Sequence, residues 1–331
     1  MSARNLRWTI IALTATACAS SAPAIRDTTA TPACEISAPD TAWLNTSLAA
    51  VREAALGLGG DIRLDQTEII VFDASCTLIV APTGERSFTA HDGLVSLPIG
   101  RTPAVITSFA APSADPGGAY FVMALPSIWE SASFKSEISV HDFTLGVFAH
   151  EISHVWQLPT YFQSIRSVTG VERLPAPVDD DMVQRIFGED ERFQRGVVAE
   201  IEAFRWAARQ EDREAVRRLA REALGQLRER WKTHFTGDYR ALAEVQATFL
   251  TLEGSGQWFA LRALTASPSG PRLEPDLALR AFGQRGAKWS QDLGLALAAV
   301  LDRLDPGWPS SVYGADEMSL IDLLDNALAQ P

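Results

Sequence analysis

The chain has 331 residues, of which 47% are hydrophobic, so it carries enough apolar material for one large domain or two modest ones. Its formal net charge of −12 argues against nucleic acid as a partner, because phosphate binding needs a clustered basic surface. No stretch of the sequence approaches the roughly 18–20 apolar residues of a membrane-spanning helix, so we expect no retained transmembrane segment.

The first 24 residues have the pattern of an export signal. Two arginines precede a mostly apolar stretch over residues 8–17, and small residues follow it. The segment Ala15-Thr16-Ala17-Cys18 approximates a lipobox, which would end the signal at residue 17 and place a lipid on Cys18. Ala22-Pro23-Ala24 instead fits ordinary cleavage after residue 24. Both alternatives predict an exported protein, periplasmic or lipid-anchored at the cell envelope, and the first adds membrane attachment through Cys18.

The next segment, residues 25–38, is rich in Ala, Ser, Thr and Pro, which is typical of a tether. Once Cys18 has been lipidated or removed, the remaining cysteines are Cys34 and Cys76. An even pair in an oxidising compartment predicts a disulfide bond, here between the N-terminal arm and the first strands.

For residues 39–160 the sequence predicts a region that contains both helices and strands. Asp40 can begin a helix that runs from residue 41 to about residue 56 and ends in glycines. From Asp142 the pattern is helical again, and we expect Leu158-Pro159 to stop that helix. Between the two helices, short apolar runs separated by turn residues predict strands at 68–72, 76–80, 104–109 and 119–125.

For residues 161–331 the sequence predicts a region that consists of helices. A proline-containing connection over residues 159–181 leads into long helical patterns at 182–208, 212–234 and 238–264, and further helices reach the C-terminus. The predicted fold class is therefore α+β, with a small β-sheet, a metal-binding helix and a large helical C-terminal portion.

The helix that begins near Asp142 contains the motif H-E-x-x-H, at His150, Glu151 and His154. Residues four apart lie on one face of a helix, so both imidazoles can bind one metal ion. Zinc held by two imidazoles and one more protein ligand keeps a position for water and lowers the pKa of that water toward about 7. Glu151 is then the candidate general base, which accepts the proton and later delivers it to a leaving amine.

A third metal ligand must come from another part of the chain. Glu253 is the first candidate, because it lies in an apolar helical pattern where an unpaired carboxylate would be unfavourable. Gly254 and Gly256 beside it leave room for the close approach of another helix. Glu200 or Glu202, in a second helical pattern, is the main alternative.

These residues resemble the gluzincin type of zinc metallopeptidase, in which a glutamate on a later helix completes the zinc site. The resemblance covers the segment from His150 to His154 and the segment around Glu253. It implies a zincin-like core, a zinc cofactor, Glu253 as third ligand, Glu151 as catalytic base, and a peptide or protein substrate. It also implies that the strand at 119–125 is an edge strand that holds extended substrate, the alternative being an ordinary core strand.

Other assignments stay open at this stage. Glu172 has a spacing from the motif that is nearer to the family pattern, but it lies in a predicted loop. The candidate oxyanion donors are Tyr120, Tyr161, Tyr239 and His234. The alternatives to a peptidase are a degenerate zincin that acts as a metal-binding envelope or interaction protein, and a zinc hydrolase that acts on a non-peptide bond. Glu151 argues against the degenerate form, since a purely structural site does not need a base.

Overall fold

The computed structural model of the chain describes residues 34–56, 58, 64, 67–113, 118–171, 178–283, 286–314 and 318–330, and for residues 162–171 only the backbone. The expected export signal, the lipidation site at Cys18, most of the tether and Glu172 lie outside these residues. Within the described ranges, none of the helices has the length and apolar character required to cross a membrane.

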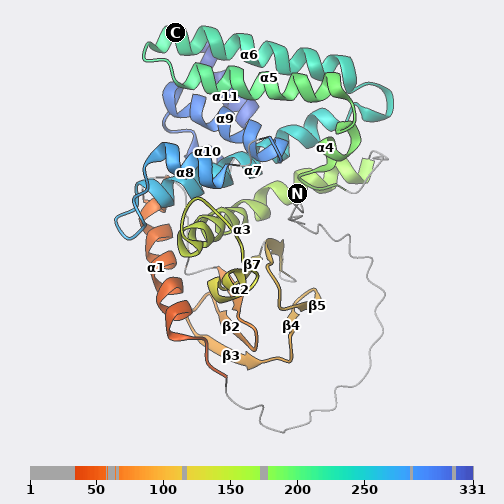
Figure 1. The fold of residues 1–331 in the computed structure, drawn as a ribbon. Helices are drawn as coiled ribbons and strands as arrows, with labels where there is room; N and C mark the ends of the chain where they lie inside the picture. The colour runs from red at the N-terminus through yellow and green to blue at the C-terminus, as the bar shows by residue number, and fades with distance from the viewer. Residues whose placement is uncertain are drawn as a thin grey trace.

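The N-terminal part contains a five-stranded mixed sheet with the strand order β3-β2-β1-β7-β6 (Figure 1). Its strands are β1 (Glu68–Phe72), β2 (Cys76–Val80), β3 (Arg86–Ala90), β6 (Ser108–Pro112) and β7 (Ala119–Ala124). The central strands β1 and β7 are parallel, and every other neighbouring pair in this sheet is antiparallel. A separate hairpin consists of β4 (Leu94–Leu97) and β5 (Gly100–Pro103).

Strand β7 is the core strand that was the alternative for residues 119–125, and not the edge strand that the resemblance implies. It lies between β1 and β6, and its residues from Tyr120 to Ala124 are all buried. A continuous apolar run of this kind is typical of a strand covered on both faces, whereas a strand with one solvated face usually alternates. The edge on this side of the sheet is β6, whose residues are mostly half-buried.

Helix α3 (Val140–Val171) packs against β6 and β7 on one side and against α7 (Leu242–Thr265) on the other. It begins at Val140, close to the predicted start near Asp142, and the backbone N–H of Asp142 donates to Ser139 Oγ at 3.0 Å. The prediction that Leu158-Pro159 stops this helix is wrong, since Pro159 lies inside it. Proline removes one backbone donor from the helical ladder, and the other bonds of the ladder can still form.

Two further helices, α1 (Ala38–Ala55) and α2 (Pro126–Ser131), complete the N-terminal part. Helix α1 begins one turn earlier than predicted, at the N-cap Ser37, whose hydroxyl accepts from the backbone N–H of Asp40. The predicted disulfide bond between Cys34 and Cys76 is present, and it joins the segment before α1 to β2.

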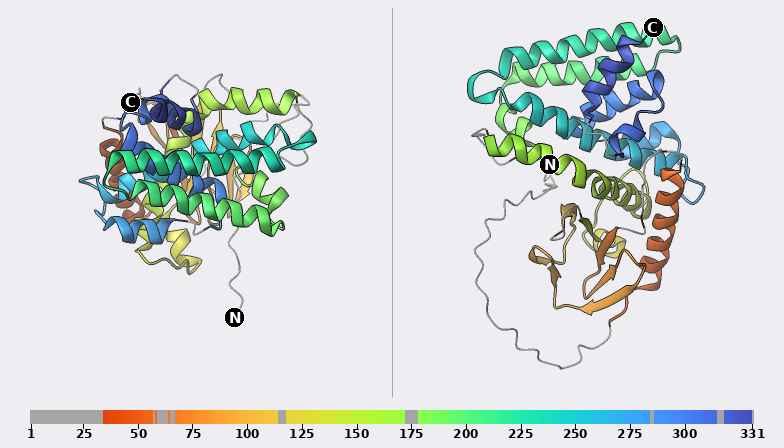
Figure 2. Two further views of the ribbon diagram at one scale, coloured as in Figure 1. Left: turned by 90° about the horizontal axis from the view of Figure 1, so that it is seen from above. Right: turned by 180° about the vertical axis from the view of Figure 1, so that it is seen from behind.

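The C-terminal part is helical and is stacked in layers on α3. In Figure 1, α7 and α9 lie above α3, and α5 and α6 form the outermost layer; Figure 2 shows the same order from behind. The helices after α3 are α4 (Met182–Phe187), α5 (Glu191–Ala208), α6 (Arg213–His234), α7, α8 (Pro275–Phe282), α9 (Trp289–Leu304), α10 (Pro309–Val312) and α11 (Leu320–Ala329). The pattern at 182–208 is thus two helices, interrupted near Gly188.

Two hydrophobic cores result, one around the sheet, α1 and α3, and one among the later helices. Helix α7 belongs to both, since Phe259 and Leu264 lie in the first core and Leu242 and Leu250 in the second. The chain is therefore a mixed α+β fold in which α7 joins the two parts. The candidate functional site lies where α7 meets α3.

Candidate metal centre

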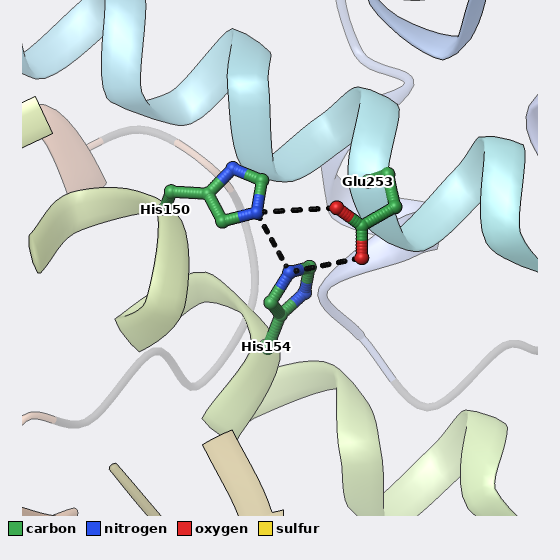
Figure 3. A group of neighbouring side chains, drawn as sticks. All are labelled: His150, His154 and Glu253. Atoms are coloured by element: carbon green, nitrogen blue, oxygen red, sulfur yellow. Dashed lines mark hydrogen bonds and ion pairs between the residues drawn. The ribbon is translucent and has the colours of Figure 1, made fainter. Parts of the chain in front are cut away.

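Three buried side chains from two helices converge on one point (Figure 3). His150 and His154 lie one turn apart on α3, and their Nε2 atoms are 2.9 Å from each other. Glu253 on α7 faces both rings, with Oε2 3.3 Å from His150 Nε2 and Oε1 3.5 Å from His154 Nε2. The exposed fraction is 5% for each histidine and 2% for Glu253, so solvent does not separate these groups.

The three side chains fit a metal ion in both spacing and chemistry. Their donor atoms all lie within 4.8 Å of one another. Donors arranged tetrahedrally at zinc distances are separated by roughly 3.3 Å, and the three observed separations lie close to this value. Two imidazoles and one carboxylate are also the donor set of several catalytic zinc sites. The group can therefore hold a metal ion, and nothing in the geometry of these three residues distinguishes zinc from other divalent ions.

The charges of the three groups are coupled. Burial alone lowers the pKa of His150, but its hydrogen bond to Glu253 and the nearby carboxylate charges outweigh burial and raise it. Burial lowers the pKa of His154 to about 4. Burial also acts to raise the pKa of Glu253, but the two imidazoles hold it well below the usual range. Glu253 is thus a carboxylate and His154 a neutral imidazole at neutral pH, which are the forms that bind metals.

Two glycines on α7 make the site possible. A Cβ atom on Gly256 would lie 2.9 Å from ring atoms of His150, so only glycine lets the imidazole approach the helix this closely. A Cβ atom on Gly254 would lie 2.3 Å from the backbone carbon of Gly294 on α9. The expectation that these glycines admit neighbouring helices is confirmed, with α3 packed at Gly256 and α9 at Gly254.

The orientation of His154 is fixed by a neighbour on its own helix. Gln157 Nε2 donates to Ser255 Oγ at 2.6 Å, which turns the carbonyl oxygen of Gln157 toward His154. That Oε1 atom lies 3.3 Å from His154 Nδ1. The proton of the neutral imidazole is therefore on Nδ1, and the lone pair of Nε2 points at the metal-binding point.

Glu151 lies between the metal-binding group and the edge strand β6. Its Oε1 accepts a hydrogen bond from Ser108 Oγ at 2.9 Å, and its carboxylate also accepts from the backbone N–H of Ala110. The other oxygen, Oε2, is buried and has no hydrogen-bond partner among the described residues. Burial is the main reason why the pKa of Glu151 is raised to about 7, so this side chain can exchange a proton near neutral pH.

The alternative third ligands lie elsewhere. Glu200 forms a buried bidentate ion pair with Arg230 in the second core, and both of its N···O distances are 2.7 Å. Glu202 is 61% exposed and pairs with Arg205 on its own helix. Of the three glutamates that the sequence leaves open as ligands within the described residues, the structure brings Glu253 to the histidines.

The candidate oxyanion donors are also mostly distant from the site. His234 packs against Phe187 and Phe193 in the second core, and Tyr239 also contacts Phe187. Tyr161 donates its hydroxyl group to the carbonyl of Met318. Tyr120 is buried on β7, where burial and the charge of Glu68 raise the pKa of its phenol.

Three side chains of the site were not anticipated from the sequence. Gln157 could have been found, because it follows His154 by three residues and so lies on the same helix face. Ser108 and Gln291 carry no such local signal, since each reaches the site through the packing of a distant strand or helix.

Comparisons with known proteins leave this site to be interpreted on its own geometry. No family model matches the sequence, and no curated protein or solved structure is significantly similar to it.

Proposed function

We propose that the protein is a zinc-dependent hydrolase, and specifically a peptidase of the gluzincin type. The observation that carries the proposal is a buried group of two imidazoles and one carboxylate, with the carboxylate of Glu151 beside it. A metal site that only stabilised the fold would not need a base whose second oxygen is unpaired and whose pKa is raised to about 7.

In this proposal His150, His154 and Glu253 hold the metal. A zinc ion in such a set supplies a water molecule with a pKa lowered to about 7 and a Lewis acid that polarises a carbonyl group. Glu151 would accept a proton at Oε2 and later deliver it to the leaving amine. Ser108 holds Oε1 and the backbone N–H of Ala110 also donates to the carboxylate, which would keep Glu151 oriented while Oε2 exchanges the proton.

Strand β6 is the surface that we propose for a peptide substrate. Among the described residues it pairs with β7 on one side only, so its other edge has backbone groups that an extended peptide can use. Ser108 and Ala110, which contact Glu151, belong to this same strand. A peptide paired with β6 would therefore run past the general base, which favours a peptide or protein as the substrate.

We further propose that the protein acts outside the cytoplasm, in the periplasm or attached to the envelope through a lipid on Cys18. The N-terminal pattern supports export. The disulfide bond between Cys34 and Cys76 supports an oxidising compartment, because cytosolic thiols are usually kept reduced.

The test is the variant Glu151→Gln, measured with labelled casein and with a mixture of quenched fluorogenic peptides. General base catalysis by Glu151 predicts a fall in turnover of about 10²–10⁴-fold, with zinc content unchanged. Glu202→Gln makes the same chemical change on an exposed helix face and should leave turnover unaltered. Zinc bound by the unaltered protein without turnover of either substrate would contradict a peptidase and favour a metal-binding envelope protein.

A further inference from the structure

Helix α9 also contributes to the metal centre, through an amide that contacts the third ligand. Gln291 Nε2 donates to Glu253 Oε2 at 3.0 Å. Oε2 is also the oxygen that lies 3.3 Å from His150 Nε2. One carboxylate oxygen thus faces a histidine and the amide of a third helix at the same time.

The contact depends on an unusually close crossing of α7 and α9. Gly254 and Gly294 lie with their backbones against each other, and a Cβ atom on Gly294 would be 2.3 Å from the carbonyl oxygen of Leu250. Gln291 precedes Gly294 by three residues, so both lie on the α9 face that contacts α7. Glu253 is adjacent to Gly254, and the glycine contact therefore brings the amide within hydrogen-bonding distance of the carboxylate.

A second glutamine contacts the other end of the Gln291 amide. Gln257 on α7 is 3% exposed, and its Nε2 donates to Gln291 Oε1 at 2.8 Å. If the Gln291 amide turned over, its oxygen would face the negative charge of Glu253 and its NH₂ group would face the NH₂ group of Gln257. The first contact would be repulsive in either orientation of Gln257, so the charge of Glu253 selects the NH₂ end of Gln291, and Gln257 donates to the oxygen at the other end.

We propose that Gln291 is a positioning residue of the metal centre, which holds Glu253 in its ligating orientation and is itself held by Gln257. This inference rests on the proposed metal-dependent function. An uncharged donor suits the role, because it restrains the carboxylate without neutralising the charge that attracts the metal. A cation at the same position would compete with the metal for Glu253.

The experiment measures zinc affinity by competition with a chromophoric chelator, using the full chain. Gln291→Met keeps the length and shape of the side chain but removes the donor, and we expect its affinity for zinc to fall by about 10–100-fold. Gln291→Glu places a second carboxylate beside Glu253. We expect it to change the affinity for zinc by at least the same factor. The matched control is Gln226→Met, which changes an exposed glutamine on α6 and should leave affinity within twofold.

A double-variant cycle separates positioning from a general loss of structure. Gln257→Met should weaken zinc binding by a few-fold in the unaltered chain and have no further effect when Gln291→Met is present, because Gln257 acts through Gln291. Thermal unfolding of the metal-free variants checks that they are folded. Zinc binding by the unaltered protein together with unchanged affinity in Gln291→Met would overturn the inference alone. A failure of the unaltered protein to bind zinc would overturn the proposed function as well.

Discussion

The helical part of the chain buries two glutamates in contrasting ways. Glu200 and Glu253 are 1% and 2% exposed, and each lies on a helix packed among others. Glu200 is paired with Arg230, which contacts both of its oxygens. Glu253 faces two imidazoles and the amide of Gln291.

The difference lies in whether the partners can give up their charge. The guanidinium group is protonated at every accessible pH, so Arg230 neutralises Glu200 permanently. Imidazoles can lose a proton and then present a lone pair, so the surroundings of Glu253 can exchange a proton for a metal ion. A buried carboxylate therefore indicates a metal site only when its partners are themselves metal ligands.

The largest effect on stability is expected when the ion pair between Glu200 and Arg230 is broken. Arg230→Met leaves Glu200 buried without a compensating charge, which should lower the free energy of unfolding by about 3–5 kcal/mol. Chemical denaturation measures the change. The folded fraction should still bind one zinc ion, because Arg230 does not contact the metal-binding group. Loss of zinc binding from the folded protein would show that the two glutamates are not independent.

A smaller effect on stability is expected at the glycine contact that brings α9 to Glu253. Gly254→Ala would place a methyl group 2.3 Å from backbone atoms of Gly294, and a backbone cannot move aside as a side chain can. We expect a loss of about 3 kcal/mol in the free energy of unfolding and weaker zinc binding. Gly225→Ala is the control, since α6 has open space there, and it should stabilise the protein by about 0.5–1 kcal/mol. Equal stability of the two variants would contradict the tight crossing.

The smallest effect is expected in the pH dependence of zinc affinity, which follows from the protons on the two histidines. Although burial acts to lower it, the pKa of His150 is raised by Glu253, so metal binding must displace a proton from His150 at pH values below that pKa. His154 adds a second proton only toward pH 4, to which burial lowers its pKa. Zinc affinity should therefore fall by about tenfold per pH unit on acidification and level off above the pKa of His150. Calorimetry in buffers of different ionisation enthalpy counts the released protons, and affinity that is independent of pH would be inconsistent with this account.

The local half of the site could be predicted from the sequence, and the distant half only in part. His150, Glu151 and His154 are fixed relative to one another by helical spacing alone. Glu253 and Glu200 both lie in helical patterns and both are buried, and what distinguishes their surroundings is the identity of partners on other helices. Arg230 is one helix away from Glu200, and no periodicity in the sequence reveals that the two side chains meet.

The same limit applies to the fold. Apolar runs located the strands β1, β2 and β7, whose burial follows from their composition. Strand order depends on pairing between distant segments, which is why the sequence left open whether residues 119–125 form an edge strand or a core strand. Strands β3 to β5 were not predicted because they are largely exposed and carry few consecutive apolar residues. Helix ends are also hard to predict from the sequence. Pro159 lies inside α3, because packing on both sides of the helix can outweigh the loss of one backbone donor.

The most direct test of the metal centre is the zinc content of the purified protein beside His154→Ala, Glu253→Gln, Glu200→Gln and Glu202→Gln, measured by mass spectrometry of the bound metal. We predict one zinc ion per chain in the unaltered protein and in the variants of Glu200 and Glu202, and none in the variants of His154 and Glu253. Zinc retained in Glu253→Gln, or absent from the unaltered protein after zinc is supplied, would contradict the proposed site.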